Sequence, residues 1–551
     1  MTNDASQDEL LEKVRSEFRD NGVPVVASSV RKFPGETIVV LEVSEDAFEK
    51  AIRLANQLDS LIPAGFITVK KTTRPVPHAL SEDTVSLSDP RISALIELLN
   101  ARSRTSEQQP SLKYVRDAAE WLRIAVSKRH HLIFGRRGVG KTALMLEAKR
   151  QVEAKGAQTL WINVQSIRSL TPEQAFLSIG ARLCDLPAVF FESWKTAGKS
   201  VAVAAQLKTR VLAQLKEAAP SAQELGLIIA ELQHLFNRFG IESSRDVYVF
   251  VDDVHYLAMS GQPKFLDMLH AISRDNAFWL KIAGIKHQTR WFSDNPPVGL
   301  QTTHDAAIIN LDITLENPAK AKEFLTSILQ TYAHEATISY LSSFISSSAL
   351  ERLVIGSGAA PRDFLLLCAN SIQVARQRAN ARVTGVQDVN EAAGLAAKNK
   401  LQELEDDAAS SFGGAQARLN CLNTIRTFLL EQSKATYFRV EFRDKEAHPG
   451  EYSLLQSLMD LRLIHLISSS LSDEHHAGRR FEVYALDLSQ FSGSRLKYNL
   501  RTLDFSGGSL VLKFTGSKTP PRVGDTPKRL LGILRRGPHF PLDQLRPPAP
   551  A

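Results

Sequence analysis

The stretch HLIFGRRGVGKTAL, residues 131–144, combines glycines, a lysine and a threonine at a spacing that can bind phosphate. Residues 135–142 match G-x-x-x-x-G-K-[ST], whose glycines let backbone N–H groups converge on phosphate oxygens at a helix N-terminus. In this chemistry Lys141 reaches the β- and γ-phosphates of ATP, and Thr142 holds Mg²⁺. The predicted cofactor-binding residues are Gly135, Arg136, Arg137, Gly138, Val139, Gly140, Lys141, Thr142 and Ala143.

The segments on either side of this loop provide the context that phosphate binding requires. Residues 131–134 are a short apolar run, typical of a buried parallel strand. After Lys141 the chain has helix-forming residues, with Leu144 and Val152 on one face and Gly156 as a stop signal. The pattern alone also arises by chance. The alternative is therefore a glycine-rich turn that only caps a helix.

A second candidate site feature is the acidic pair in DVYVFVDDVH. Residues 247–251 are wholly apolar and predict a buried strand that ends at Asp252 and Asp253. Near a phosphate loop, Asp252 would hold Mg²⁺ and Asp253 would polarise the water that attacks the γ-phosphate. Adjacent acids also end many ordinary strands, so the prediction depends on both features lying in one α/β region.

Two clusters of positive and polar residues could complete the site. Arg362, in GSGAAPRDF, lies near a helix start, from which it could contact the γ-phosphate; a surface arginine after a turn is the alternative. The stretch KHQTR follows the apolar strand FWLKIAGI, at the end of a sheet where ligands bind. There Arg290 could act as an arginine finger on a neighbouring subunit. The other candidates for sensing phosphate are Lys286, His287 and Thr289. The predicted catalytic residues are Lys141, Asp253, Arg290 and Arg362.

Alternating apolar strands and helices predict an α/β fold, a P-loop NTPase parallel sheet with helices on both faces. The expected additions are a small N-terminal α+β domain, a helical lid and a winged-helix domain. The predicted domains are 1–75, small α/β; 76–109, linker; 110–316, NTPase core with a helical insertion at 185–245; 317–405, lid; 406–492, winged helix; and 493–551, a basic, proline-rich tail.

Composition sets further limits on the function. A length of 551 residues predicts two to four domains. The net charge of +7 comes from residues 493–551, which hold eleven Lys and Arg against three Asp and Glu. That tail could bind nucleic acid or acidic partners, or only solubilise the chain. Cys184, Cys368 and Cys421 are scattered and suit a reducing cytoplasm. No apolar run as long as a membrane span and no targeting peptide is recognised.

Over roughly residues 110–490 the motifs GRRGVGKT, VFVDD and GAAPR resemble those of AAA+ ATPases, with the origin-recognition-complex group and the STAND NTPases as the nearest types. The resemblance implies that Lys141 and Thr142 belong to the Walker A motif and that Asp252 and Asp253 belong to Walker B. Arg362 then corresponds to sensor 2. Many members of these groups act on DNA or in anti-phage defence.

Two departures from that pattern bear on the rate of hydrolysis. AAA+ hydrolases usually have Glu where this chain has Asp253, which is one methylene shorter. The strand before Lys286 also runs through Gly284 and has no plain Asn or Thr sensor at its end. Slow hydrolysis is therefore expected. For Arg136 and Arg137, contact with phosphate or a partner subunit and solvent exposure are both open.

Three functions follow as hypotheses. The first is an Mg-dependent AAA+ ATPase that couples nucleotide state to oligomer formation or to DNA or nucleoprotein. The second is a slowly hydrolysing STAND-like switch that signals through protein partners, and the third is a scaffold. The helix GEYSLLQSLMD contains no Lys or Arg, so the winged helix is expected to pack against protein. DNA contacts would then come from the tail or from ARQRANAR, residues 375–382.

Overall fold

The computed structural model divides the chain into two compact units, Met1–Thr84 and Val85–Ala551, which are described separately. The residues that the structure describes are 5–33, 36–43, 47–62, 65–71, 85–101, 120–410, 414–474, 476–493, 496–506, 508–515 and 530–545. Residues 102–119, which belong to the predicted linker and the start of the predicted NTPase core, lie outside them.

The N-terminal unit is a three-stranded sheet with two helices. Its elements are α1 (Ala5–Asp20), β1 (Val25–Phe33), β2 (Glu36–Val43), α2 (Phe48–Leu58), the 3₁₀ turn η2 (Asp59–Leu61) and β3 (Gly65–Lys71). β2 lies in the centre, antiparallel to β1 and parallel to β3. Alternate residues of β2, Val39, Leu41 and Val43, are fully buried and pack with Val14 and Phe18 of α1. This unit therefore has a hydrophobic core of its own.

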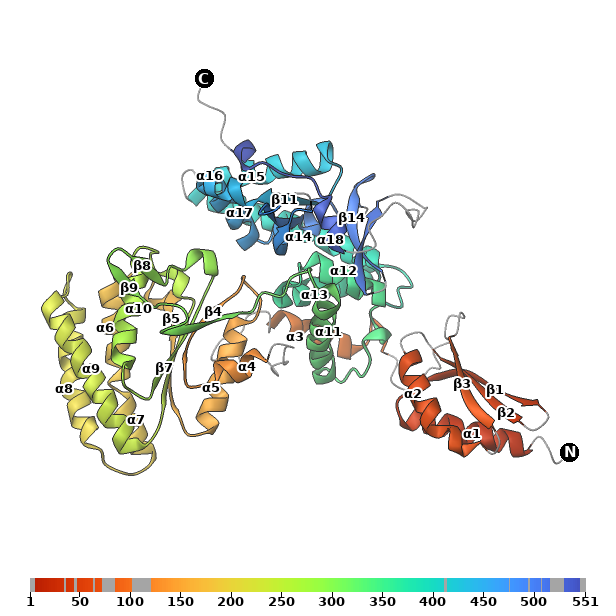
Figure 1. The fold of residues 1–551 in the computed structure, drawn as a ribbon, viewed down its shortest axis with the longest axis horizontal. Coiled ribbons are helices and arrows are strands. Elements are labelled where there is room, and N and C mark those ends of the chain that lie inside the picture. The colour runs from red at the N-terminus through yellow and green to blue at the C-terminus, as the bar shows by residue number, and fades with distance from the viewer. Residues whose placement is uncertain are drawn as a thin grey trace, which may run out of the picture. The chain divides into compact units, whose positions relative to one another are not determined.

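The second unit contains a five-stranded sheet in the order β10-β4-β7-β6-β5, of which β4, β7 and β5 are labelled in Figure 1. Its strands are β4 (His130–Phe134), β5 (Gln158–Asn163), β6 (Val247–Asp252), β7 (Phe278–Gly284) and β10 (Ala306–Asn310). Every strand pair in it is parallel. Parallel sheets are buried on both faces, which accounts for the apolar runs in the sequence. The predicted parallel α/β sheet is confirmed, and it fits the P-loop NTPase arrangement.

Helices cover both faces of the sheet. On one face α5 (Lys141–Ala154) packs Leu144 and Val152 against Ile133 and Phe250. On the other face a larger cluster joins the sheet to α6 (Pro172–Leu183), α9 (Ala222–Ser243) and α10 (Gln262–Ser273). α7 (Leu186–Ser193) and α8 (Lys199–Leu215) pack with α9 in the region predicted as a helical insertion. The remaining short elements are η3 (Val164–Ile167), η4 (Val254–Tyr256), η5 (Lys286–Gln288), β8 (Phe292–Asp294) and β9 (Pro297–Gly299), together with α4 (Trp121–Ala125).

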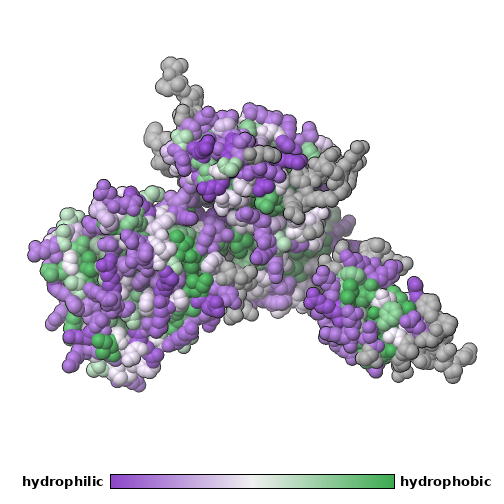
Figure 2. Space-filling model, in the orientation of Figure 1, coloured by the Kyte–Doolittle hydropathy of each residue, from purple (hydrophilic) through white to green (hydrophobic). Residues whose placement is uncertain are grey.

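One apolar stretch departs from the sequence expectation that no run is long enough for a membrane span. Pro172–Ser193, which comprises α6 and α7, is the one stretch in the described part of the chain that is long and apolar enough by length and composition. Of its most apolar window, 67% is buried inside the fold. Phe176 and Phe190 illustrate why, because both lie in the core that packs against the sheet, and the core domain surface in Figure 2 mixes hydrophilic residues with hydrophobic patches.

The lid is built from α11 (Pro318–Glu335), η6 (Leu341–Ser343), α12 (Ser347–Gly356), α13 (Pro361–Gln377) and α14 (Val386–Ser410). α3 (Pro90–Ala101), which was predicted as part of a linker, also belongs to it. Ile92, Leu95 and Leu99 of α3 are fully buried in the lid core. The predicted boundaries did not assign this helix to the lid because its apolar residues have no partner in the neighbouring sequence.

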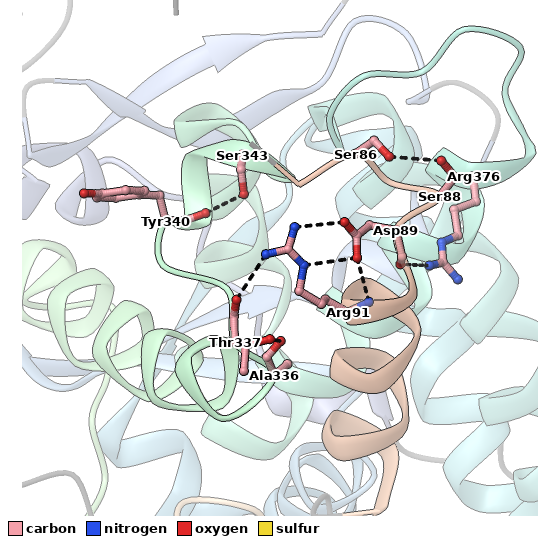
Figure 3. A network of polar contacts seen from close by, with 9 residues as sticks. All are labelled: Ser86, Ser88, Asp89, Arg91, Ala336, Thr337, Tyr340, Ser343 and Arg376. Atoms are coloured by element: carbon pink, nitrogen blue, oxygen red, sulfur yellow. Dashed lines mark hydrogen bonds and ion pairs between the residues drawn. The ribbon is translucent and has the colours of Figure 1, made fainter. Parts of the chain in front are cut away.

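A polar network holds the segment before α3 against the lid (Figure 3). Arg91 donates from Nη2 to Asp89 Oδ2 at 3.0 Å and from Nη1 to the carbonyl of Thr337. Arg376 donates from Nε to the carbonyl of Leu87 at 2.6 Å and from Nη2 to Ser93 Oγ at 3.0 Å. The bonds from Arg91 to Thr337 and from Arg376 to Leu87 and Ser93 connect residues more than 200 positions apart in the sequence.

Beyond the lid, the elements follow the order helix, strand, helix and hairpin. They are α15 (Gly414–Thr427), the π turn η7 (Phe428–Gln432), β11 (Tyr437–Glu441), α16 (Phe442–Ala447), α17 (Pro449–Asp460), β12 (Ile464–Ser472), β13 (Arg480–Leu486) and η8 (Leu488–Gln490). The three strands form an antiparallel sheet in the order β11-β13-β12. The short helix α16 was not anticipated from the sequence.

Residues 493–551 differ from the predicted tail. They contain the hairpin β14 (Arg501–Ser506) and β15 (Ser509–Phe514), then α18 (Leu530–Arg535) and η9 (Leu542–Leu545). Leu503, Leu534 and Phe540 are buried among residues of the lid and of the β11-β13-β12 sheet. The excess of Lys and Arg concealed these anchors, because composition averages over a segment and its few apolar side chains fix its position.

The lid and the described residues that follow it share one hydrophobic core. A Cβ placed on Gly356 of the lid would lie 3.0 Å from the Leu488 side chain, which shows how closely the two parts pack. We call helices α3 and α11–α14, together with the described residues of 414–545, the lid–C-terminal body. The five-stranded sheet with its helices is the core domain.

Candidate functional site

The glycine-rich loop joins β4 to α5, as predicted. Gly138 and Gly140 have φ angles of +82° and +102°, in the region that residues with a Cβ rarely adopt. Gly138 is also constrained from outside, since a Cβ there would lie 2.9 Å from Cβ of Arg362. The loop can take this shape and accept this neighbour only with glycine at that position.

Lys141 is the first residue of α5 and its side chain folds back over the loop. Nζ donates to the carbonyls of Gly135 at 2.8 Å and Arg136 at 3.1 Å. Burial lowers the pKa of Lys141, whereas the nearby carboxylates of Asp253 and Asp252 raise it. An ammonium group held at the mouth of a glycine-rich loop is suited to contact phosphate oxygens.

Thr142 and Asp252 meet although 110 positions separate them in the sequence. Thr142 Oγ1 donates to Asp252 Oδ2 at 2.8 Å. Asp252 ends β6 and is buried, and this burial, with the neighbouring Asp253, raises its pKa to about 7. Its other oxygen, Oδ1, is buried without a hydrogen-bond partner among the described residues. A buried carboxylate oxygen beside a hydroxyl fits the hard oxygen ligands that Mg²⁺ takes.

Asp253 directly follows β6 in a strained backbone conformation. Its φ is +61°, the left-handed region that a non-glycine residue adopts at a cost. Burial raises the pKa of its carboxyl, while Lys141 and Arg137 lower it. The turn directs the chain away from the sheet and places Asp253 beside the loop lysine. Asp252, Asp253, Lys141 and Thr142 therefore lie together at one end of the sheet, as the sequence predicted.

Arg136 differs from its predicted place in the phosphate-binding set. Its backbone N–H and its Nε both donate to Asp312 Oδ1, at 2.8 and 3.2 Å. Its Nη2 donates to the carbonyls of Ile313 at 2.8 Å and Gly358 at 3.2 Å. The guanidinium therefore connects the loop to the chain leaving β10 and to the lid. Arg137, by contrast, has an exposed side chain.

Arg362 lies at the start of α13 in the lid, in contact with the phosphate loop. Its backbone N–H donates to the carbonyl of Gly138 at 3.2 Å. The contact with Gly138 described above adds close packing to this hydrogen bond. The lid thus brings an arginine to the loop, at the position that the sequence suggested.

The polar cluster after β7 is more dispersed than predicted. Thr289 is buried and donates from Oγ1 to the carbonyl of Ile285 at 2.8 Å, which closes a local turn. His287 Nε2 lies 2.9 Å from Asp460 Oδ2 at the end of α17. Lys286 and Arg290 are exposed, and Arg290 donates to Ser293 Oγ at 3.2 Å. These side chains differ in direction because the 3₁₀ turn η5 separates them.

Sequence reasoning missed three residues at this site: Asp312, Asp460 and His255. Asp312 follows the strand β10 and could have been found by the same strand-end rule that identified Asp252. Asp460 had been considered only for the charge of its helix. His255 stands two positions after Asp253, and its Nδ1 lies 3.9 Å from Asp253 Oδ1.

The lid segment proposed for DNA contact uses its arginines elsewhere. Arg376 binds the segment before α3, and Arg378 pairs with Asp388, its Nε lying 2.6 Å from Oδ1. Arg382 is exposed. Two of the three arginines in ARQRANAR therefore have intramolecular partners that hold the lid together.

Comparison with known proteins adds little to this geometry. No protein-family model and no curated protein matches the chain. A variant of Thermotoga maritima RuvB is 12% identical, with a TM-score of 0.28, covering 63% of this chain and 85% of that one. The structure of Drosophila ORC bound to DNA is also 12% identical, with a TM-score of 0.26, covering 71% and 90%. The assignment of the P-loop NTPase fold accordingly rests on the strand arrangement, the loop and the Thr142–Asp252 contact.

Proposed function

We propose that this protein is an AAA+-type ATPase that binds Mg-ATP at the loop of residues 135–143 and hydrolyses it slowly. The observation that carries the proposal is the convergence of Thr142, Asp252 and Lys141 at one end of the sheet, with Arg362 of the lid against the same loop. Phosphate-binding, metal-binding and lid groups from distant parts of the sequence then share one site.

Each residue has a distinct role in the proposed reaction. Lys141 binds the β- and γ-phosphates, and Thr142 with Asp252 would hold Mg²⁺, which when bound neutralises phosphate charge. Asp253 orients the attacking water and accepts its proton. As the water oxygen bonds to the γ-phosphorus, the bond from phosphorus to ADP breaks, giving ADP and phosphate. Arg362 stabilises the negative charge on the γ-phosphoryl oxygens from the lid.

The output that we propose is a movement of the lid–C-terminal body. This body contacts the core domain near the glycine-rich loop through three hydrogen bonds. Arg136 of the loop donates to the lid, and Arg362 and Asp460 of the body contact the core domain. A γ-phosphate would add negative charge among these groups, and its loss would remove it. The protein would thereby link the presence of that phosphate to the position of the body.

A STAND-like switch is the second candidate and has an observation in its favour. Asp253 has a shorter side chain than glutamate, which suits slow turnover and a long-lived ATP state. The exposed Arg290 is available to reach the nucleotide of a neighbouring subunit in an oligomer. In this version the partners are further copies of the chain and a signalling protein, and the cell compartment is the cytoplasm.

The deciding experiment measures ATP turnover and oligomer mass with and without DNA. The proposal expects calorimetric binding of ATP that requires Mg²⁺, and slow release of phosphate. Stimulation by DNA would favour an ATPase acting on nucleic acid, and assembly driven by ATP alone would favour the switch. If ATP does not bind in the presence of Mg²⁺, the proposal is wrong.

A further inference from the structure

His255 lies inside the candidate site, although the proposed reaction gives it no role. It belongs to the 3₁₀ turn η4 that follows Asp253. Its side chain is 4% exposed, and its ring lies 4.7 Å from that of Tyr256, tilted by 30°. The imidazole is therefore held in the protein interior beside the catalytic carboxylate.

The Nδ1 atom of this imidazole is buried without a hydrogen-bond partner among the residues that the structure describes. Leaving a buried polar atom unpaired costs stability, so such an atom calls for an explanation. Asp253 Oδ1, at 3.9 Å, is the carboxylate oxygen that faces it. A small rotation of either side chain would shorten this separation to hydrogen-bond length.

The surroundings of His255 keep its ring neutral. Burial lowers its pKa to about 3, and Lys141, Arg137 and His287 lower it as well. A neutral imidazole carries one N–H donor and one acceptor nitrogen. With the proton on Nδ1, the ring can donate to a carboxylate and hold its orientation without adding a charge next to the phosphates.

We propose that His255 is a positioning residue for Asp253, donating from Nδ1–H to its carboxylate when nucleotide occupies the loop. This inference rests on the proposed ATP hydrolysis. Asp253 has a short side chain and a strained backbone. One additional hydrogen bond to one carboxylate oxygen would therefore fix the direction of the other. The second carboxylate oxygen then remains available to accept the proton of the attacking water.

Conservative substitutions test this role. The amide nitrogen of Asn lies near the place of Nδ1, whereas that of Gln lies near the place of Nε2. We expect His255→Asn to keep kcat within about threefold, and His255→Gln to lower kcat by about 100-fold, the cost of a misplaced reacting group. The KM for ATP should change by less than about twofold in both, because His255 does not contact the phosphates. Equal loss in both variants, or no loss in either, would overturn the proposal.

His270 is the matched control. It is also a buried histidine of the core domain, and its Nδ1 is likewise buried without a hydrogen-bond partner in the described structure. It packs against His130 at a ring distance of 5.3 Å, at the opposite end of the sheet from Asp253. His270→Asn and His270→Gln should therefore leave kcat unchanged, while melting temperatures report any loss of folding.

A spectroscopic readout separates this inference from the ATPase proposal. In protein labelled with ¹⁵N-histidine, the His255 signals are those missing from His255→Asn. With Mg-ADP added, we expect a protonated Nδ1 whose chemical shift changes in Asp253→Asn, while the His270 signals stay in place. A ring protonated only at Nε2, with no response to Asp253→Asn, overturns the inference whether or not the wild-type protein hydrolyses ATP. Absence of wild-type turnover, with the expected spectrum, would instead overturn only the ATPase proposal.

Discussion

The core domain and the lid–C-terminal body are each stabilised by a hydrophobic interior. The contacts that connect the two near the glycine-rich loop, in contrast, include several hydrogen bonds. Each of the two parts has an extensive interior of aliphatic and aromatic side chains. Near the glycine-rich loop three hydrogen bonds connect them, Arg136 with Gly358, Arg362 with Gly138, and His287 with Asp460, and Arg362 also packs against Gly138. Apolar packing resists change over a wide area, whereas a few hydrogen bonds can exchange partners when a charged ligand arrives.

This difference locates the point at which a nucleotide could act. Of the three contacts, that of Arg136 uses a guanidinium group, which also suits phosphate, and that of Arg362 uses the backbone N–H of a residue with such a side chain. We call these three contacts the joint. Replacing residues on either side of the joint should separate two properties. Nucleotide binding depends on the core domain, whereas coupling of nucleotide state to the position of the lid–C-terminal body depends on both parts.

Loss of the loop lysine should have the largest effect. Lys141→Ala removes the ammonium group that binds phosphate, and we expect the Kd for Mg-ATP to rise by about 100-fold, as for a lost charge-assisted hydrogen bond. Isothermal titration calorimetry measures this change. Lys155→Ala, at the exposed far end of the same helix, is the control and should bind ATP normally. Unchanged affinity in Lys141→Ala would contradict the assignment of the site.

The next prediction concerns the buried carboxylate of the core domain. Because the pKa of Asp252 is raised to about 7 from about 3.9 in the unfolded chain, its contribution to stability is present below about pH 4 and is lost as the pH rises through 7. Asp252→Asn cannot ionise. In metal-free buffer we expect its melting temperature to exceed that of the wild type by about 5 °C at pH 8, by less at pH 5, and by little at pH 4.

Asp246 is the control for this pH dependence. It stands just before the first residue of β6, the strand that Asp252 ends, and its Oδ2 lies 2.8 Å from Nζ of Lys128. Asp246→Asn should not reproduce a gain in stability at pH 8. A wild-type protein whose advantage over Asp252→Asn grows with pH would show that Asp252 is stabilised as a carboxylate, against the prediction.

The lid side of the joint should matter less than the loop. Arg362→Ala removes a positive charge from the γ-phosphate position, and we expect kcat to fall by about tenfold. Protection of α13 from hydrogen exchange on adding ATP should also disappear. Arg382→Ala changes an exposed arginine of the same lid and should behave as wild type. A full ATP-dependent protection of α13 in Arg362→Ala would remove this arginine from the coupling.

The strand-end chemistry of the core domain could be read from the sequence, because apolar runs and glycine spacing are local signals. Residues 247–251 and the motif at 135–142 predicted a sheet and a loop that the structure contains. The roles of Arg136 and His287 could not be read in this way. Their partners, Asp312 and Asp460, lie 176 and 173 positions away, and nothing near either residue reveals them.

Segments outside the core were harder to predict for a related reason. α3 and α18 are short, and their apolar residues are buried only because the lid–C-terminal body folds around them. Charge and proline content dominated the interpretation of residues 493–551, whereas Phe540 and Leu534 determine where that segment lies. Tertiary burial outweighed the local composition in both cases.

The smallest expected effect concerns the C-terminal side of the joint, and it tests the comparison most directly. Asp460 accepts hydrogen bonds from His287 Nε2, at 2.9 Å, and from Gln288 Nε2, across the two bodies. Within the lid–C-terminal body a similar pair joins His539 Nε2 to Asp444 Oδ2 at 3.1 Å.

We expect Asp460→Asn to speed amide exchange of residues 286–290 by about fivefold, with kcat changed less than about threefold. Asp444→Asn, the matched control, should leave that exchange unchanged because apolar packing holds its surroundings. Faster exchange at 286–290 in both variants would mean that the two bodies move as one, and the distinction between a packed interior and a polar joint would then fail.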